Sequence, residues 1–434
     1  MAVNFTKQNI AIKEKKVSDK KRILVLADHP LTPSGVGTQT KYFIETLLNT
    51  GRYSFVCFGG AIKHNDYNPM KIDPWGDDWI IYPVDGYGNQ TMIRSVLRNH
   101  KPDALWFMTD PRFWTWLWDI DNEIRTHIPM IYHHVWDNFP APMFNRGYYT
   151  SNDKIVCISK VTHEIVKEVA PEVDSCYLPH AVNDEIFHPL DKEKTQKFKK
   201  ESMPVAEDKF VFFWNNRNAR RKQSGTLIYW FKEFLDRVGH DKATLLMHTD
   251  PFDVHGQNLN VIIQHLGIDQ GQVLLSTQKT PAESLAQIYN AVDCTINISD
   301  AEGFGLATLE SLSCGTPIIV NMTGGLQEQV TDGENWFGIG IEPSSKAIIG
   351  SQDVPYIYED RINKEDFIDA LTKMLEMSPE ERDALGQAGR QHVQDNYSFD
   401  QFRQDWISVM DDVVEKNGSW ETRKKYKTYE FTEL

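Results

Sequence analysis

Short apolar runs alternate with amphipathic stretches twice along the chain. In the first half these runs are continuous and lie at 22–27, 55–58, 79–82, 104–108, 130–132 and 154–158. Such runs are typical of parallel strands that are covered on both faces. A second series starts at Phe210 and continues with the apolar runs 243–247, 273–275 and 294–299. Two series of this kind predict an α/β protein with two doubly wound, Rossmann-like domains that face each other across a cleft.

The same pattern divides the chain into segments. Residues 1–20 are lysine-rich and polar, lack the apolar core of a secretion signal, and are predicted to form a mobile arm. Residues 21–185 are predicted to form the first domain and residues 209–399 the second. Residues 186–208 between them are polar and rich in lysine, which favours a linker.

Composition places the chain among ordinary globular proteins, with 41% hydrophobic and 25% charged residues in a length of 434. The net charge of −15 argues against a surface that binds polyanions in general. The five cysteines show neither a CxxC pair nor zinc spacing, which favours reduced thiols in a cytoplasmic protein. No apolar run reaches the roughly 18 residues that a transmembrane helix needs.

The most informative segment runs from Glu302 to Glu310. It follows the predicted strand 294–299 and combines a glycine-containing turn with a helix that starts near Leu306 and ends before Gly315. The first N–H groups of such a helix have no internal partners and bind anions, phosphate above all. Glu302 is expected in the turn, and Glu310 is expected to lean back over the helix start. A solvated turn glutamate and a salt-bridged helix glutamate are the alternative interpretation.

This segment resembles the E-x7-E motif of the retaining nucleotide-sugar glycosyltransferases of family 4, the glycosyl transferases group 1. The order of the surrounding residues extends the resemblance, with a helix at 281–289, then 291–293, the motif itself, 315–317 and finally 324–325. The resemblance implies the GT-B fold, in which the first domain binds the acceptor and the second binds the nucleotide sugar. It also implies that a last helix, within about 400–434, crosses back to complete the first domain.

A basic segment after the first strand of the second series supplies candidate cations. A guanidinium and an ammonium at the end of a strand can clamp a diphosphate. Arg217 and Lys222 match the family's pattern of an arginine followed by a lysine five positions on, although the neighbouring glycines of the family are absent. Arg220 and Arg221 are further candidates for the same role. A solvated basic helix start is the alternative interpretation.

Two features of the first domain resemble other family sites. Gly35 and Gly37 match the family's Gly-Gly loop, with Ser34 in place of the first glycine, and small residues there let a backbone approach a ligand closely. His133 and His134 end a predicted strand, where family members often carry a histidine that faces the donor sugar. Because successive strand residues face opposite ways, only one can point into the cleft, and His134 is favoured. A plain turn and structural histidines are the alternatives.

The resemblance implies a role for each of these positions. Glu302 would hold the sugar or steady positive charge at its anomeric carbon, together with His134 or His133, while Glu310 would accept hydrogen bonds from the ribose. Arg217 and Lys222 would hold the diphosphate. Five further positions are expected to line the donor: Phe304, Gly305, Leu306, Gln278 and Lys279.

The expected reaction is transfer of a hexosyl or pentosyl group, with retention, from a UDP- or GDP-linked sugar, without a metal or other cofactor. The expected acceptor is a hydroxyl of a glycan or glycolipid. The aromatic cluster at 113–118 is interpreted as core, with an acceptor platform or shallow peripheral contact with a membrane as alternatives. Two other activities stay open: transfer of sugar to a base of a nucleic acid, as in some phage enzymes, and a GT-B sugar phosphorylase or epimerase.

Overall fold

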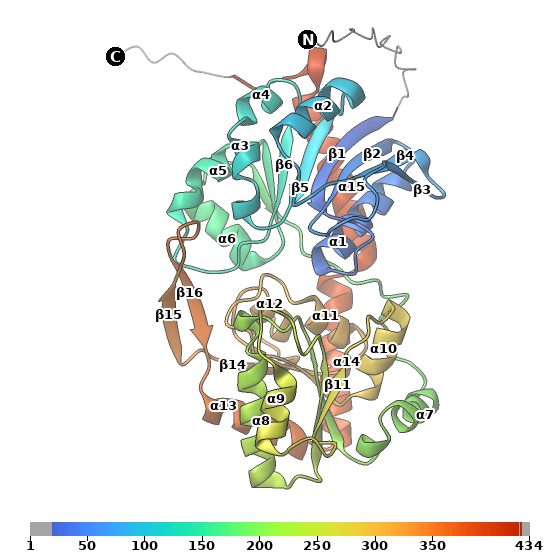
Figure 1. The fold of residues 1–434 in the computed structure, drawn as a ribbon, viewed down its shortest axis with the longest axis vertical. Coiled ribbons are helices and arrows are strands. Elements are labelled where there is room, and N and C mark those ends of the chain that lie inside the picture. The colour runs from blue at the N-terminus through green and yellow to red at the C-terminus, as the bar shows by residue number, and fades with distance from the viewer. Residues whose placement is uncertain (1–19, 425, 428–434) are drawn as a thin grey trace, which may run out of the picture.

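The computed structural model describes residues 20–424, 426 and 427. Two lobes are stacked along the long axis of the molecule, and each contains a parallel sheet with helices on both faces (Figure 1). This arrangement confirms the predicted class of two doubly wound α/β domains. Of the predicted N-terminal arm, only Lys20 falls within the described residues. In that same part of the chain, no helix is both long and apolar enough to cross a bilayer.

The first lobe is built on an eight-stranded sheet with the order β3-β4-β2-β1-β5-β6-β7-β8. Its strands are β1 (Lys21–Asp28), β2 (Tyr53–Gly60), β3 (Met70–Ile72), β4 (Gly76–Pro83), β5 (Ala104–Met108), β6 (Met130–His134), β7 (Lys154–Cys157) and β8 (Ser175–Tyr177). Its helices are α1 (Gly35–Leu48), α2 (Gln90–His100), α3 (Thr115–Trp118), α4 (Asp121–Arg125), α5 (Arg146–Thr150) and α6 (Lys160–Val169). Only β3 pairs antiparallel, with β4, so the remaining carboxyl ends of the strands share one edge.

One face of the first sheet is covered by α1 and by the last long helix of the chain, α15 (Phe399–Asn417). Phe43 of α1 stacks on Trp106 of β5, with ring centroids 4.4 Å apart, and meets the edge of Trp406 of α15 at 4.8 Å. All three rings are buried. The last helix therefore returns to complete the first lobe, as the GT-B resemblance implies. The helices α2, α3 and α6 cover the opposite face.

The second lobe is built on a six-stranded parallel sheet with the order β11-β10-β9-β12-β13-β14. Its strands are β9 (Phe210–Asn215), β10 (Ala243–His248), β11 (Val273–Ser276), β12 (Cys294–Asn297), β13 (Ile318–Asn321) and β14 (Gly338–Ile341). Its helices are α8 (Ser224–Val238), α9 (Leu259–Leu266), α10 (Ala282–Ala291), α11 (Leu306–Ser313), α12 (Leu326–Val330), α13 (Lys364–Glu376) and α14 (Pro379–Asn396). Helices α8, α9 and α13 pack on one face of the sheet, and α10, α11, α12 and α14 pack on the other.

The segment predicted as a linker contains a helix, α7 (Lys192–Ser202). This helix has no fully buried residue and lies against α10. Its sequence KEKTQKFKKES includes a single apolar side chain, Phe198, so no apolar stripe marks it as helical. Lys199 Nζ lies 3.4 Å from Asp293 Oδ2 and helps to hold the helix on the second lobe. Short 3-10 helices occur at η1 (Pro111–Phe113), η2 (Met143–Asn145), η3 (Pro204–Ala206), η4 (Arg220–Lys222) and η5 (Trp420–Thr422).

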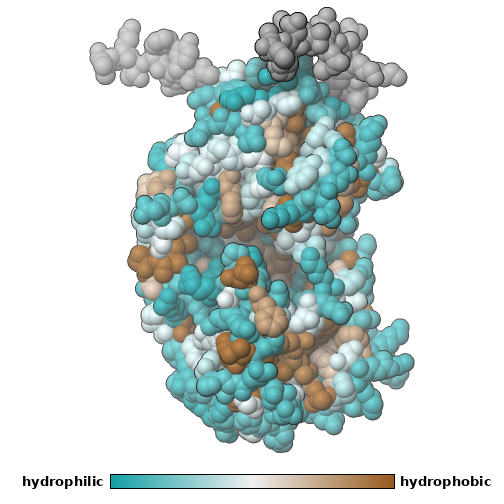
Figure 2. Space-filling model, viewed as in Figure 1, coloured by the Kyte–Doolittle hydropathy of each residue, from teal (hydrophilic) through white to brown (hydrophobic). Residues whose placement is uncertain are grey.

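An antiparallel hairpin of β15 (Ser345–Ile349) and β16 (Ile357–Arg361) reaches from the second lobe to the first (Figure 1). The N–H of Tyr358 donates to the carbonyl of Phe139 at 2.8 Å, and Asn138 Nδ2 donates to the carbonyl of Tyr358 at 2.6 Å. Val354, between the two strands, is buried in the core of the first lobe. The hairpin therefore ties the lobes together along one side. Figure 2 shows a mostly polar surface with an indentation between the lobes.

Candidate functional site

The turn from Glu302 to Gly305 lies between β12 and α11, at the carboxyl edge of the second sheet. Gly305 has a φ of 92° and serves as the N-cap of α11 without a capping side chain. Gly324 and Gly325 pack directly on this turn. A Cβ on Gly324 would lie 2.0 Å from the Glu302 carbonyl oxygen, and a Cβ on Gly325 would lie 2.7 Å from the Gly303 carbonyl oxygen. Both positions therefore need glycine for the turn to keep its shape.

Glu302 and Lys222 form a buried ion pair at this turn. Glu302 Oε2 accepts a hydrogen bond from Lys222 Nζ and a second one from Asn297 Nδ2 at 3.3 Å. The two charged residues are only 9% and 7% exposed. Burial opposes ionisation of Glu302, but the charges of Lys222 and Arg221 outweigh it and hold the glutamate's pKa below its ordinary value. Burial, with the neighbouring Arg221, lowers the pKa of Lys222 to about 8.

The two arginines in this basic segment take different positions. The Arg221 guanidinium donates to the carbonyl of Ala301, directly before Glu302. Arg217 instead pairs with Asp253, with Nε 2.6 Å from Oδ2, and its side chain is 61% exposed. Of the predicted clamp, the structure thus brings Lys222 to the turn, together with Arg221, and directs Arg217 towards the loop that follows β10.

Glu310 lies in α11 and joins a short chain of hydrogen bonds. Its Oε2 accepts a hydrogen bond from the Tyr289 hydroxyl of α10 at 2.7 Å, and that hydroxyl accepts one from Asn215 Nδ2 at 2.9 Å. Burial raises the pKa of Glu310 to about 7, against the opposing effect of the tyrosine. The sequence alone gave no signal for Tyr289 or Asn215, because their role depends on two helices and a strand that meet only in the fold.

The glycines of the first domain lie where the two lobes meet. Ser34 caps α1, accepting from the N–H of Gly37 at 3.0 Å and donating to Asp28 Oδ2 at 2.8 Å. A Cβ on Gly37 would lie 2.6 Å from the Thr32 carbonyl oxygen, so this position needs glycine. A Cβ on Gly35 would lie 3.1 Å from Leu306 Cδ1. The amino end of α1 therefore approaches the amino end of α11.

The histidines at the end of β6 point to opposite faces of the sheet, but the favoured one faces away from the second lobe. His134 Nε2 lies 2.7 Å from the Tyr149 hydroxyl inside the first core. His133 meets His180 with ring centroids 5.2 Å apart, and His180 meets Phe304 at 5.1 Å. His134 thus lies in the first core, whereas His133 is linked to Phe304 only through His180. Burial lowers the pKa of His133, and it lowers that of His180 to about 3, so both rings are neutral.

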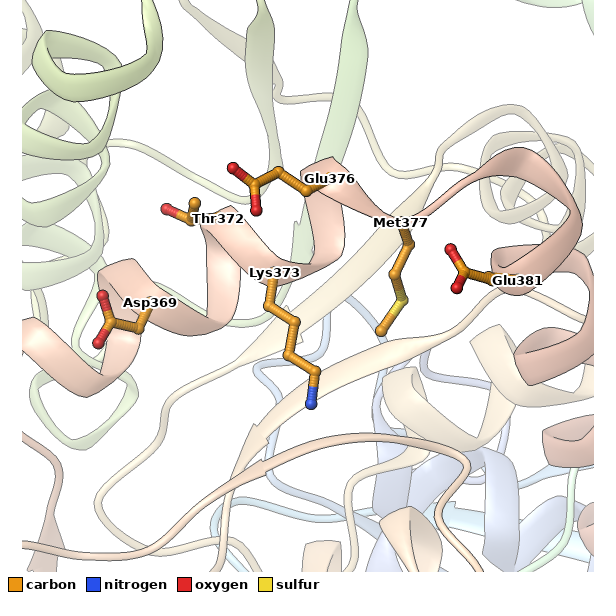
Figure 3. Close-up of a pocket in the computed structure, with 6 residues that line it drawn as sticks. All are labelled: Asp369, Thr372, Lys373, Glu376, Met377 and Glu381. Atoms are coloured by element: carbon orange, nitrogen blue, oxygen red, sulfur yellow. The ribbon is translucent and has the colours of Figure 1, made fainter.

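The remaining predicted positions differ in burial, and a depression lies elsewhere on the second lobe. Phe304 is buried within the Glu302 turn, whereas Gln278 and Lys279 are exposed in the loop after β11. A depression along α13 and the start of α14 is lined by Asp369, Thr372, Lys373, Glu376, Met377 and Glu381 (Figure 3). It includes none of the residues at the Glu302 turn. Among the described residues, no group of three or more His, Cys, Asp or Glu side chains is arranged to hold a metal ion.

A family model matches most of the second lobe. The family model described as glycosyl transferases group 1 matches residues 195–392. This group 1 domain contains Lys222, the Glu302 turn and Glu310, so the predicted donor motif lies inside it.

Curated relatives match part of the chain, and solved structures superpose on nearly all of it. It is 28% identical to D-inositol 3-phosphate glycosyltransferase of Corynebacterium jeikeium over 174 residues, which are 39% of this chain and 41% of that protein. The chain thus spans less than half the length of that curated relative. Sucrose-phosphate synthase of Thermosynechococcus elongatus superposes with a TM-score of 0.73 and 16% identity, over 92% of this chain and 100% of that chain.

A second solved structure resembles the chain at a similar level. Anabaena HepE, in complex with UDP and glucose, superposes with a TM-score of 0.66 and 13% identity, over 90% of this chain and 99% of that chain. Identities this low show the fold alone. Together with the group 1 domain, they establish a GT-B architecture for this chain.

Proposed function

We propose that this protein is a retaining glycosyltransferase that moves a hexosyl or pentosyl group from a nucleotide diphosphate sugar to a hydroxyl of an acceptor. The observation that carries the proposal is the buried pair of Lys222 and Glu302 at the turn before α11, within a group 1 domain. A cation suited to the leaving group and a carboxylate suited to the sugar stand side by side there.

The diphosphate is proposed to bind at the amino end of α11. Since Gly305 offers no capping side chain, the first N–H groups of the helix are available to an anion. Lys222 and Arg221 add positive charge at the same point. Arg217 is exposed and joins them by leaving Asp253. Donors fixed in this way stabilise the charge that grows on the departing diphosphate.

Binding of the donor is proposed to exchange the partners of Lys222 and Glu302. In the structure each neutralises the other in a buried site. A diphosphate attracts Lys222 by its greater negative charge. Glu302 is then free to accept hydrogen bonds from sugar hydroxyls and to stabilise positive charge at the anomeric carbon. Glu302 therefore becomes free to act on the sugar only when the donor has bound.

Glu310 is proposed to bind the ribose. Its carboxyl has a pKa of about 7 and is held in place by Tyr289. Hydrogen bonds from ribose hydroxyls favour the ionised form. The backbone of Phe304, Gly305 and Leu306 lines the sugar and diphosphate, and the loop with Gln278 and Lys279 lies near the base.

The acceptor hydroxyl is proposed to enter from the first domain, where Gly35 approaches Leu306 of the second lobe. The departing phosphate takes the proton of the attacking hydroxyl, on the same face of the sugar that it leaves, so the configuration is retained. Closure of the lobes excludes water from this step. The cations and amides neutralise the leaving group, and no metal or other cofactor is required in this proposal.

The donor is proposed to be a UDP-linked sugar, with a GDP-linked one as the alternative, since the structure of HepE holds UDP and glucose in the same fold. The acceptor class is a glycan or a glycolipid. We propose a cytoplasmic location, and a glycolipid acceptor would bring the enzyme to the surface of a membrane.

A panel of UDP- and GDP-linked sugars tests the proposal. We expect one donor to bind and to be hydrolysed slowly in the absence of acceptor, with release of the α-anomer from an α-linked donor as read by NMR. Release of the inverted anomer contradicts retention. Turnover that requires inorganic phosphate identifies a phosphorylase instead. Absence of binding to every nucleotide and nucleotide sugar overturns the proposal.

A further inference from the structure

Asp137 belongs to the first domain, in the loop after β6, yet it lies on the donor turn of the second. A Cβ on Gly303 would lie 3.9 Å from Asp137 Oδ2 and 3.1 Å from the carbonyl oxygen of Val135. A Cβ on Gly324 would lie 3.5 Å from the Cβ of Asp137. The carboxylate is therefore held over the two glycines that shape the Glu302 turn, on the side from which the first lobe approaches.

The charges around Asp137 already have partners. Glu302 is paired with Lys222, and Arg221 donates to the carbonyl of Ala301. In contrast, within residues 20–424, 426 and 427, no hydrogen bond or ion pair reaches the Asp137 carboxylate. Burial raises its pKa to about 6, against the effect of Arg221 and with a further contribution from Glu302. A half-buried carboxylate without a hydrogen-bond donor is costly, so the site is suited to a ligand that supplies one.

We propose that Asp137 accepts a hydrogen bond from a hydroxyl of the donor sugar and so lets the site distinguish a nucleotide sugar from the bare nucleotide. This inference rests on the proposed function. Asp137 and Glu302 approach the sugar from different domains, and each presents carboxylate oxygens to it. Sugars with several free hydroxyls satisfy both groups at once, which makes Asp137 a specificity-determining residue for the donor.

The charge of Asp137 favours a sugar over the other parts of the donor. A carboxylate repels the diphosphate, which is drawn to Lys222 and Arg221. The ribose is assigned to Glu310, which lies further along α11 and has its own partner, Tyr289. Gly303 lies just before the start of α11, where the diphosphate is proposed to bind. The part of the donor that lies over Gly303 is therefore the sugar attached to the diphosphate.

Matched binding measurements test this assignment. We use UDP-glucose with UDP, UDP-N-acetylglucosamine with UDP, and GDP-mannose with GDP as probes, and measure the dissociation constants by calorimetry. For the pair that the wild type binds, we expect Asp137→Ala to weaken binding of the nucleotide sugar by about tenfold or more, the effect of losing a hydrogen bond to a charged group, and to leave the bare nucleotide unchanged. Asp137→Asn keeps one acceptor oxygen and should lose less.

Asp110→Asn is the matched control. This residue also belongs to the first domain and contributes negative charge near Asp137, but it pairs with Arg112 at 2.9 Å, and asparagine preserves its capping of η1. We expect the control to leave the ratio of the two dissociation constants at its wild-type value. Equal weakening of sugar and bare nucleotide by Asp137→Ala, or no weakening of either, overturns the inference alone. Failure of the wild type to bind any probe overturns the proposed function, and the inference with it.

Discussion

Gly35 and Leu306 meet across the two domains, with the position of a Cβ on Gly35 only 3.1 Å from Leu306 Cδ1. Each residue begins a helix, α1 in the first domain and α11 in the second. The amino ends of two helices are thus brought together with the Leu306 side chain between them. The contact needs a missing side chain on one helix and the relative position of the lobes seen in the structure.

We predict that Gly35→Val separates the two helix ends and slows turnover. The added Cβ and methyl groups crowd the Leu306 side chain, so we expect the helix ends to move apart. Since misplacement by about 1 Å can cost about 100-fold in rate, we expect a fall in kcat of at least about tenfold with little change in nucleotide affinity. Initial rates of donor hydrolysis and calorimetry with the nucleotide give the two quantities.

Gly147→Ala serves as the control for this change. Gly147 lies in α5, and a Cβ there would meet nothing within 4 Å. We expect wild-type rates from it. Full activity in Gly35→Val would show that the closed contact is not required for turnover.

We predict that Glu302→Ala abolishes transfer and leaves nucleotide binding nearly intact. The variant removes the carboxylate that is proposed to accept hydrogen bonds from the sugar and to stabilise charge at its anomeric carbon. It keeps Lys222 and Arg221, which are proposed to bind the diphosphate. Loss of one preorganised electrostatic group typically costs about 100- to 1,000-fold in kcat. Rates and nucleotide affinity are measured on the same preparation, with Glu342→Ala, at an exposed position, as control. Loss of nucleotide binding would reassign Glu302 to the nucleotide.

We predict that Lys222→Met destabilises the fold and that Glu302→Gln relieves most of the loss. Removing Lys222 leaves a carboxylate that is 9% exposed with Asn297 and Arg221 as its remaining support. Breaking a buried pair in this way costs about 3–5 kcal/mol. Urea unfolding of the wild type, both single variants and the double variant gives the coupling energy. Additive effects would show that the pair contributes nothing to stability.

We predict a pH-dependent contribution of Glu310 to stability. Its pKa is raised from 4.5 to about 7 in the folded protein, so the folded state holds this proton more tightly than the unfolded state. The free energy of unfolding that Glu310 contributes therefore falls as the pH rises from about 4.5 to about 7, and stays low above that range. The difference in stability between wild type and Glu310→Gln, measured at pH 5 and pH 8, should shift against the wild type at the higher pH. A difference that does not change with pH would contradict the raised pKa.

Most strands could be predicted because they are buried on both faces. The runs at β1 and β9 are continuous and apolar, which reports burial directly. The hairpin was not predicted, because its second strand, Ile357–Arg361, mixes apolar and charged residues. Its Glu359 is only 2% exposed and is held by Arg220 and Arg361, an arrangement that depends on distant segments rather than on local pattern.

The candidate site could be predicted where spacing along one element fixes it. Glu302 and Glu310 flank one turn and one helix, so their separation determines their geometry. The choice between Arg217 and Arg221 could not be made, since it depends on where Asp253 and Ala301 lie. Strand alternation showed that the paired histidines point opposite ways, but not which face of β6 leads to the second lobe.

The hairpin of β15 and β16 determines how the two lobes can part. Tyr358 donates from its N–H to the carbonyl of Phe139 at 2.8 Å, and Asp360 donates from its N–H to the carbonyl of Asp300 at 2.9 Å. The first bond joins the two lobes, and the second anchors the hairpin within the second lobe, while α1 lies on the other side of the molecule (Figure 1). The hairpin thus adds a main-chain link to the two crossings of the chain between the lobes, which lie beside α1. We therefore expect a relative movement of the lobes to strain or break the bond between Tyr358 and Phe139.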